Sequence, residues 1–389
     1  MGTKTVILGG GAGGIVTASS LRALLPKEHE VVIVDRRTTF HLGAPKTWVM
    51  LGERTVAQVT RLLDSLRKRG IGLMQAEVQR IDAAKREVQT SKGPLKADYL
   101  VIALGAHLNL AAVPGLEQAA HTFYTMEGAV RLGEALKAFK GGDLVILNPR
   151  MPIQCPPAPY EVALHLHHLF EARGIRQATR VSLYTVEPLP MPTAGSQVGQ
   201  IIRDELAKRN IAYYPQKRVR GVDAARRIVS FEDGSEARFD LLIAVPPHEA
   251  PRPVRDSGLT NESGWIPVDA RTLSTSFDRV YAIGDVTVVS LPGRYKPDVP
   301  LALPKAAVFA EAQGRVVAAR IAAHILGKQP LETFEGEGFC FVEMGAQTAM
   351  GGEALFFEMP HPKVIPLAAD RRQFEEKLAW AENFLTKYL

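Results

Sequence analysis

The sequence predicts an α/β protein made of two units of parallel sheet and helix, followed by a small α+β domain at the C-terminus. Short apolar runs typical of buried parallel strands alternate with helical segments in residues 5–105 and again in residues 143–245. From residue 331 the pattern changes to short strands, an aromatic patch and one final helix. A chain of 389 residues is long enough for two or three such domains.

The composition is that of a globular chain with a modest basic excess. Its 47 Lys and Arg residues against 41 Asp and Glu residues leave a net charge of +6. The basic residues are scattered and no aromatic and basic motif accompanies them, so we expect no nucleic-acid partner. The excess of positive charge is consistent with an ordinary solvated surface, with an anionic substrate or with contact to an anionic membrane.

The start of the chain and its apolar runs bear on its location. No stretch approaches the roughly 20 apolar residues of a membrane-spanning helix. The first strand begins at residue 3, which leaves no room ahead of it for a signal peptide. We therefore expect a cytoplasmic protein or one bound peripherally to a membrane. Two cysteines cannot form a disulfide scaffold, so they are either inert buried thiols or a redox pair.

The first unit opens with a glycine-rich turn between a strand and a helix, Gly9-x-Gly11-x-x-Gly14. Gly9 allows the tight turn, Gly11 lets the backbone approach a pyrophosphate, and Gly14 permits close packing of helix and strand. The N-terminus of the helix favours the phosphate charge. Asp35, at the end of the second strand, accepts a hydrogen bond from a ribose hydroxyl. Together these features predict a Rossmann-like dinucleotide-binding unit.

The periodic segments divide the chain into three domains. A discontinuous dinucleotide-binding domain takes residues 1–105 and 265–330, a second Rossmann-like domain takes residues 106–264, and a C-terminal domain takes residues 331–389. Strands are expected at residues 5–9, 30–35, 98–105, 143–148, 181–186, 228–231, 241–245 and 279–285, with short strands between 71 and 96. Helices are expected at residues 15–25, 56–69, 158–173, 197–209, 304–326 and from about 370.

The second unit differs from the first at the turn after its first strand. Residues 149–161 read Pro-Arg-Met-Pro-Ile-Gln-Cys155-Pro-Pro-Ala-Pro-Tyr-Glu161 and contain no glycine. Without glycine the backbone cannot come close to a pyrophosphate, which argues against a second nucleotide. The turn offers a thiol and a carboxylate instead.

Three motifs in order carry a resemblance to a known group. With Gly9-x-Gly11-x-x-Gly14, Ala103-Leu-Gly105 and Ala282-Ile-Gly284-Asp285, the chain resembles the flavoproteins with two dinucleotide-binding domains. The resemblance implies non-covalent FAD, with Asp285 on the ribityl chain and Lys305 beside the flavin edge where negative charge develops on reduction. The cofactor contacts that it implies are Gly9, Gly11, Ala12, Gly13, Gly14, Asp35, Arg36, Pro45, Val78, Ala103, Gly105, Gly284, Asp285 and Lys305.

Two further segments resemble the sulfide:quinone oxidoreductase and flavocytochrome c sulfide dehydrogenase branch of that group. They are Cys155-Pro-Pro-Ala-Pro-Tyr-Glu161 and Cys340-Phe-Val-Glu-Met-Gly345. The resemblance implies that Cys155 and Cys340 form a disulfide or longer sulfur bridge against the flavin and oxidise sulfide to zero-valent sulfur or polysulfide. Glu161 is the candidate proton carrier, and a helix-capping carboxylate is the alternative.

The electron acceptor is indicated less directly than the donor. The chain lacks a third cysteine before the pair, and residues 187–193 lack the histidine that many quinone reductases carry there. Quinone is the expected acceptor, with Phe341 in the candidate quinone slot, and a cytochrome c is the alternative. Two other function classes are an enzyme like the type II NADH dehydrogenases and a non-catalytic, flavin-bound sensor or sulfur carrier. The sequence also leaves open whether the protein forms a homo-oligomer.

The final helix has an apolar stripe with two interpretations. It suits docking on a membrane surface, or packing on the protein's own domain or on a dimer partner. The residues of the stripe are Phe374, Leu378, Ala381, Leu385 and Tyr388, with Trp380 and Phe384 beside them and basic residues around them.

Three histidines in one helix raise the question of a metal. His165, His167 and His168 have no acid or cysteine at zinc spacing, and only His165 and His168 share a helix face. We therefore expect no metal site.

Overall fold

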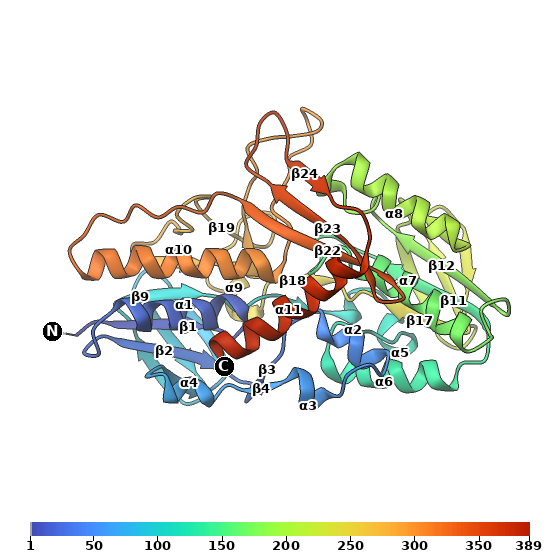
Figure 1. Cartoon of the computed structure of the whole chain (residues 1–389). Helices are drawn as coiled ribbons and strands as arrows, with labels where there is room; N and C mark the ends of the chain where they lie inside the picture. The colour runs from blue at the N-terminus through green and yellow to red at the C-terminus, as the bar shows by residue number, and fades with distance from the viewer. Residues whose placement is uncertain (1) are drawn as a thin grey trace.

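The computed structural model describes residues 2–389, with two parallel sheets side by side and a smaller antiparallel sheet and final helix packed across them (Figure 1). This arrangement confirms the predicted α/β class. The first sheet draws strands from two separate stretches of sequence. Its order is β20 (Val280–Ala282), β9 (Tyr99–Ile102), β1 (Lys4–Leu8), β2 (Glu30–Asp35) and β5 (Gly72–Gln75), all parallel.

Helices α1 (Ala12–Leu24) and α10 (Ala307–Ile325) pack side by side next to the first sheet (Figure 1). Glycines let their backbones approach, since a Cβ on Gly314 would lie 2.8 Å from the carbonyl oxygen of Gly13. Helix α1 begins earlier than predicted and takes in the last glycines of the motif. Helix α10 begins later than predicted, so Lys305 lies in the extended segment before the helix rather than in its first turn.

The second sheet has four parallel strands and is covered by helices of the same unit. Its order is β13 (Ile211–Tyr214), β12 (Thr179–Thr185), β11 (Gly142–Asn148) and β17 (Leu241–Ala244). The principal helices are α6 (Met126–Ala138), α7 (Ala158–Ala172) and α8 (Ser196–Lys208). Antiparallel sheets of three strands accompany the two units: β6 (Val78–Asp82), β7 (Glu87–Thr90) and β8 (Gly93–Lys96), and β14 (Val219–Asp223), β15 (Ile228–Phe231) and β16 (Glu236–Arg238).

The C-terminal part is an antiparallel sheet of β22 (Glu337–Gly345), β23 (Thr348–Leu355) and β24 (Lys363–Pro366), followed by α11 (Arg371–Tyr388). Asp370 caps α11 by accepting a hydrogen bond from the Gln373 backbone N–H at 2.8 Å. Figure 1 shows α11 running from the second unit towards the first, so this helix bridges them.

The apolar stripe of α11 is buried against the chain itself. Phe374, Ala381, Phe384, Leu385 and Tyr388 are all buried, and the Phe384 ring lies 5.5 Å from the Phe40 ring. Packing on the protein's own domains is therefore the correct interpretation of the stripe, and this stripe is not a membrane-docking surface. Among residues 2–389, no helix is long and apolar enough to cross a membrane.

The predicted helix at residues 56–69 is wrong. The chain forms a single capped turn, then a short strand that pairs with β3, then a second turn. Thr60 ends the first turn in an extended conformation, with φ −114° and ψ 146°. Pairing with β3 thus outweighs the local apolar spacing of this segment.

The remaining elements are short. The helical ones are α2 (Pro45–Met50), α3 (Val56–Val59), α4 (Ser65–Lys68), α5 (Leu116–Ala119), α9 (Arg252–Arg255), η1 (Leu110–Ala112), η2 (Pro192–Ala194) and η3 (Gly284–Val286). The strands are β3 (Thr39–Phe40), β4 (Arg61–Leu62), β10 (His107–Leu108), β18 (His248–Glu249), β19 (Ile266–Pro267) and β21 (Thr287–Val288).

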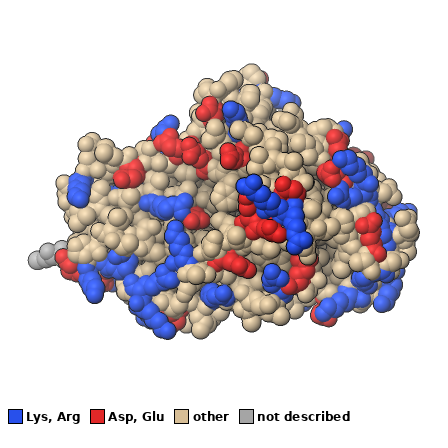
Figure 2. Space-filling view, in the orientation of Figure 1, with Lys and Arg blue, Asp and Glu red and all other residues tan. Residues whose placement is uncertain are grey.

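Charged side chains of both signs are interspersed over the face shown in Figure 2. Basic atoms gather at its lower left, over the region of α4. The rest of this face is mostly uncharged, with scattered basic and acidic groups and one patch of both signs near its centre, in keeping with the modest net charge.

Candidate functional site

The glycine turn has the geometry that a bound dinucleotide requires. Gly9 has φ +105°, and a Cβ there would lie 2.3 Å from the carbonyl oxygen of Ala103. A Cβ on Gly14 would lie 1.9 Å from the carbonyl oxygen of Gly9. A Cβ on Gly11 would meet nothing within 4 Å, so this position borders open space at the N-terminus of α1. Ala12 and Gly13 form the first turn of that helix, where free N–H groups bind anions.

Asp35 is buried at the end of β2 and accepts hydrogen bonds from its neighbours. Its Oδ2 lies 2.6 Å from the Gly10 backbone nitrogen, and the guanidinium of Arg37 contacts both carboxylate oxygens at 2.8 and 3.1 Å. Burial opposes ionisation of Asp35, but the hydrogen bonds and charge of Arg37 outweigh it and lower the pKa. The arginine beside Asp35 is therefore Arg37, whereas Arg36 is exposed and lies 3.8 Å from Glu77.

Asp285 and Lys305 meet the proline-rich turn of the second unit. Asp285 Oδ2 accepts a hydrogen bond from Gln154 Nε2 at 2.5 Å, while Oδ1 is buried without a partner in residues 2–389. The Lys305 ammonium donates to the carbonyl oxygens of Asp285 and Thr287 at 2.6 and 2.9 Å and lies 3.5 Å from the centre of the Trp265 ring. Burial lowers the pKa of Lys305 to about 8 and raises that of Asp285.

These features fit a flavin nucleotide. The unpartnered Asp285 Oδ1 is a buried acceptor that suits a ribityl hydroxyl, and the turn at Gly11 has room for a pyrophosphate. Of the other implied contacts, Pro45 opens α2, Val78 opens β6, Ala103 and Gly105 follow β9, and Gly284 opens η3.

Gly9→Ala is expected to yield protein with little bound flavin. The added methyl group would clash with the Ala103 carbonyl, and φ +105° is strained for any residue with a Cβ. The absorbance ratio of flavin to protein after purification measures the effect, and we expect a loss of roughly tenfold or more, equivalent to about 1.4 kcal/mol or more of binding free energy. Gly43→Ala is the matched control, because a Cβ there meets nothing within 4 Å. Equal flavin content in both variants would contradict this assignment.

A cavity of about 760 Å³ lies where the second unit, the segment before α10 and the C-terminal sheet meet. Both cysteines line it, together with Lys305. Alternation along β22 directs Cys340 and Val342 into the cavity, while the intervening Phe341 is not among its wall residues. The walls are mostly apolar and include Ile153, Pro156, Val186, Met191, Leu303, Phe309, Met350 and Val364.

The two cysteines are free, half-buried thiols in apolar surroundings. Cys155 has φ +51°, and its backbone N–H donates to the Lys305 carbonyl at 2.8 Å, which joins the turn to the segment before α10. Burial raises the pKa of Cys340 to about 12 and raises that of Cys155 further. For both thiols the charge of Glu161 adds to this shift and the charge of Lys377 opposes it. The thiols therefore share the same ionisable neighbours.

Those neighbours form a buried charged cluster of Glu161, Lys377, Glu343 and His165. The Lys377 ammonium lies 2.6 Å from Glu161 Oε1 and 2.5 Å from Glu343 Oε1. Glu343 Oε2 lies 2.7 Å from His165 Nε2, and Trp48 Nε1 donates to the same carboxylate at 3.1 and 3.2 Å. Burial opposes the charge of Lys377, but the two carboxylates raise its pKa. The interpretation of Glu161 as a helix cap is incomplete, since its partner is a lysine from α11.

Lys46 is a functional candidate that the sequence analysis missed. Its ammonium donates to the Tyr124 carbonyl oxygen at 2.5 Å. Burial lowers the pKa of Lys46 to about 8, and the nearest opposing charges are those of Cys155 and Asp285. Lys46 therefore lies near both Cys155 and Asp285. No local pattern marks it, since a lysine following a proline is ordinary in a sequence.

Phe341 lies in an aromatic group on the α11 side of β22. Its ring is 5.5 Å from the Phe339 ring, which in turn is 5.9 Å from the Trp380 ring. Glu343, two residues further along the strand, also faces α11 through Lys377. Phe341 is thus separated from Cys340 by the strand itself.

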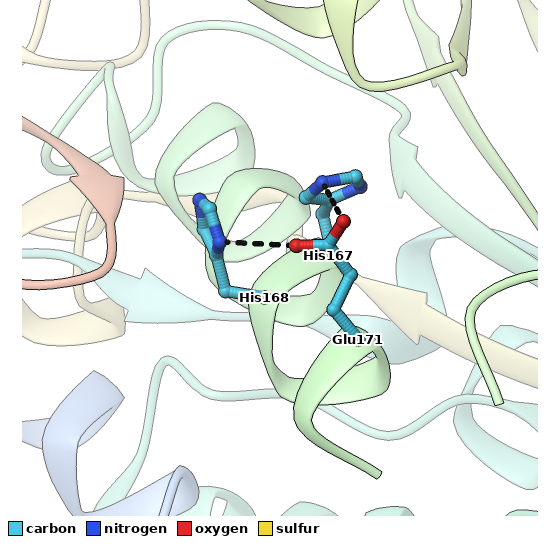
Figure 3. Close-up of side chains that lie close together, drawn as sticks. All are labelled: His167, His168 and Glu171. Atoms are coloured by element: carbon cyan, nitrogen blue, oxygen red, sulfur yellow. Dashed lines mark ion pairs between the residues drawn. The ribbon is translucent and has the colours of Figure 1, made fainter. Parts of the chain in front are cut away.

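The histidines of α7 have acidic partners, contrary to the sequence analysis. Figure 3 shows Glu171 between His167 and His168, with contacts of 3.2 and 3.4 Å. The Arg176 guanidinium donates to His167 Nδ1 at 2.9 Å. Because arginine is always a donor, Nδ1 holds the lone pair of the ring and Nε2 holds the proton, so Nε2 cannot ligate a metal in this arrangement. The cluster is a group of polar side chains in contact on α7.

Comparisons with known proteins agree with this geometry. The family model described as "Pyridine nucleotide-disulphide oxidoreductase" matches residues 3–148 and 155–314. A sulfide-quinone reductase of Aquifex aeolicus (strain VF5) is 25% identical over 400 residues, covering 100% of this chain and 90% of the relative. A type II NADH:quinone oxidoreductase of Staphylococcus aureus (strain MSSA476) is 24% identical over 383 residues, covering 92% of this chain and 90% of the relative.

A solved structure extends the likeness to the whole fold. The X-ray structure of the sulfide:quinone oxidoreductase from Aquifex aeolicus matches with a TM-score of 0.89 at 24% identity, covering 99% of this chain and 91% of that one. The family model alone spans well over half of the residues. The chain belongs to the pyridine nucleotide-disulphide oxidoreductase family and, within it, resembles the sulfide:quinone oxidoreductases.

Proposed function

We propose that this oxidoreductase is an FAD enzyme that oxidises sulfide through Cys155 and Cys340 and passes the electrons to a quinone. The observation that carries the proposal is the shared cavity. Two cysteines far apart in the sequence line one apolar chamber with Lys305, whose neighbour Asp285 has a free oxygen suited to a ribityl hydroxyl. The likeness to a sulfide-quinone reductase over the whole chain supports the same substrates.

A flavin bound here would supply a two-electron acceptor for the sulfur chemistry. Hydrosulfide attacks a Cys155–Cys340 disulfide, which gives a persulfide on one cysteine and a thiolate on the other. Lys305 and Lys46 provide positive charge at the cofactor side of the cavity. Glu161, held by Lys377, accepts the proton that the sulfur species releases. The product is zero-valent sulfur or polysulfide.

The raised pKa values of the thiols favour sulfide as the nucleophile. At neutral pH both cysteines are protonated, so a reduced pair reacts slowly and the incoming sulfide must attack an oxidised pair. A thiolate of high pKa is also a poor leaving group. The positive charge of Lys377 opposes the rise in the pKa of both thiols. It therefore assists the departure of whichever cysteine is the leaving group.

An NADH-consuming flavoenzyme is the second candidate, because the chain also aligns with a type II NADH:quinone oxidoreductase. The turn at residues 149–157 argues against it. The Gln154 side chain donates to Asp285, and the Cys155 backbone N–H donates to the Lys305 carbonyl, so the turn does not form an open glycine cradle. The turn lacks the glycines that let a pyrophosphate approach the backbone.

Anaerobic mixing of the oxidised holoenzyme with sulfide or with NADH tests the proposal. Sulfide is expected to bleach the flavin absorption within the dead time of hand mixing, and NADH is expected to leave it unchanged over minutes. Reoxidation is then followed with a soluble quinone analogue and with a cytochrome c. Bleaching by NADH alone would establish the second candidate. Faster reoxidation by the cytochrome would identify cytochrome c, rather than a quinone, as the electron acceptor.

Phe341→Ala is expected to raise the KM for a quinone analogue about tenfold, which is about 1.4 kcal/mol of lost binding. The reason is that Phe341 belongs to an aromatic group with Phe339 and Trp380, and its ring offers a face on which a quinone ring can stack. Steady-state kinetics at saturating sulfide give the KM. Phe357→Ala, which removes an aromatic ring that packs on Phe334, is the control. An unchanged KM in Phe341→Ala would place the quinone elsewhere.

A further inference from the structure

One side chain joins the turn that carries Cys155 to the segment that carries Asp285. Gln154, the residue before Cys155, donates from Nε2 to Asp285 Oδ2 at 2.5 Å. We propose that Gln154 is a positioning residue, which holds the Cys155 thiol in place relative to the flavin site through its contact with Asp285. This inference rests on the proposed function, because it concerns where one of the two reacting thiols lies.

The Asp285 carboxylate offers its two oxygens to two different partners. Oδ2 accepts the hydrogen bond from Gln154, while Oδ1 is buried and has no partner among residues 2–389. The free oxygen suits a ribityl hydroxyl, as described above, so the contact with Gln154 leaves the cofactor contact available. Because a carboxylate is a small rigid group, a donor on one oxygen constrains the direction of the other. A single carboxylate therefore links the flavin site to the residue next to the thiol.

The backbone of Cys155 has a conformation that needs support from its surroundings. Its φ of +51° lies in the left-handed region, which is unfavourable for a residue with a Cβ. Such a conformation persists where neighbouring groups hold the chain from several sides. The Cys155 N–H donates to the Lys305 carbonyl at 2.8 Å, and the Cys155 carbonyl accepts from the Ala158 N–H at 2.9 Å. Gln154 holds the preceding residue of the same turn.

The backbone of Gln154 is anchored as well as its side chain. The hydroxyl of Tyr124, a buried residue, donates to the Gln154 carbonyl oxygen at 3.0 Å. The Lys46 ammonium donates to the Tyr124 carbonyl oxygen at 2.5 Å, which ties this tyrosine to α2. Gln154 therefore lies between Tyr124 on one side and Asp285 on the other, and a shift of the turn would break one of these two hydrogen bonds.

The chemistry of the contact separates positioning from simple packing. The Asp285 oxygen accepts, so residue 154 must donate. Gln154→Leu fills a similar space without a donor. Gln154→Glu keeps the shape of the side chain but offers a donor only while the two carboxyl groups share a proton, and two ionised carboxylates in contact repel each other. The effect of Gln154→Glu should therefore depend on pH, whereas that of Gln154→Leu should not.

The first test compares the rates of sulfide-driven flavin reduction in the variant and wild-type holoenzymes, as a ratio at each pH. The ratio removes the pH dependence of sulfide itself. For Gln154→Glu we expect a rate close to that of the wild type at about pH 6 and roughly tenfold lower at about pH 9. Gln154→Leu should be slow at both pH values by on the order of 10²-fold, the effect of misplacing a reacting group by about 1 Å. Gln200→Leu is the matched control, because Gln200 donates to Asp204 at 2.6 Å on the exposed face of α8.

The second test needs no sulfide. The holoenzyme is treated with a phosphine reductant and then with iodoacetamide, and mass spectrometry of its peptides gives the alkylation rate of each cysteine. In Gln154→Leu we expect Cys155 to react about tenfold faster than in the wild type, because a released turn exposes the thiol and removes part of the burial that raises its pKa. Cys340, which lies on β22, should react at the wild-type rate, and the flavin content should be unchanged.

Three results would overturn the inference. They are equal alkylation of Cys155 in Gln154→Leu and the wild type, a rate ratio of Gln154→Glu that does not change with pH, and loss of flavin from both variants. The last result would mean that Gln154 holds the cofactor rather than the thiol. If sulfide fails to bleach the wild type while Cys155 of Gln154→Leu is alkylated faster, the proposed function is wrong and the positioning role stands.

Discussion

Replacing Cys155 or Cys340 with serine is expected to abolish sulfide-driven reduction of the bound flavin. A serine hydroxyl cannot form the disulfide that hydrosulfide attacks, and neither thiol has a substitute, since the sequence contains two cysteines. Loss of a group that bonds covalently to the substrate typically lowers the rate by on the order of 10³-fold or more. Stopped-flow mixing of each oxidised variant with sulfide measures the loss directly.

The control for this experiment is a change in the same cavity wall. Met350→Leu conserves the volume of a neighbouring wall residue and should reduce at nearly the wild-type rate. All variants should keep their flavin and be reduced normally by dithionite, because neither cysteine lies in the glycine turn. Full-rate bleaching by sulfide in either serine variant would exclude a cysteine mechanism.

Most of the fold could be predicted because its strands are apolar runs with clear ends. The predicted strand at residues 30–35 has the bounds of β2, and the predicted helix at residues 197–209 differs from α8 by one residue at each end. These segments are buried on both faces or carry one apolar face, so local pattern and tertiary environment agree. The helix at residues 56–69 failed because a two-residue strand pairing with β3 is invisible in the sequence.

The candidate site, like the fold, has parts that could be predicted from the sequence and parts that could not. The turn at Cys155 could be predicted because its prolines replace glycines at a position where a nucleotide would need them. The cluster around Lys377 could not, since its members come from distant segments and lysine is rarely buried. The basic residues of the last helix suggested a solvated or membrane-facing side. Only the folded chain shows that Lys377 turns inward to two carboxylates.

Lys377→Met is expected to be among the most destabilising single changes in the chain. The variant would leave Glu161 and Glu343 buried beside each other without their shared cation. Removing one partner of a buried ion pair typically costs about 3–5 kcal/mol of unfolding free energy. Urea unfolding at pH 7, followed by tryptophan fluorescence, should show a correspondingly lower midpoint. Lys387→Met is the control, because Lys387 is exposed on the same helix.

The pH dependence of this loss identifies its cause. Burial opposes ionisation of Glu343, but Lys377 and His165 hold its pKa at about 2, below the ordinary value of about 4.3. A carboxyl whose pKa is lowered in the folded state stabilises the fold at pH values above its ordinary pKa. This contribution to stability is lost as the pH falls towards the pKa of the folded state. Without Lys377 the carboxylates protonate more readily, so the deficit of Lys377→Met should shrink between pH 7 and pH 4. A deficit that stays constant over this range would point to lost packing of the lysine chain rather than to unpaired charge.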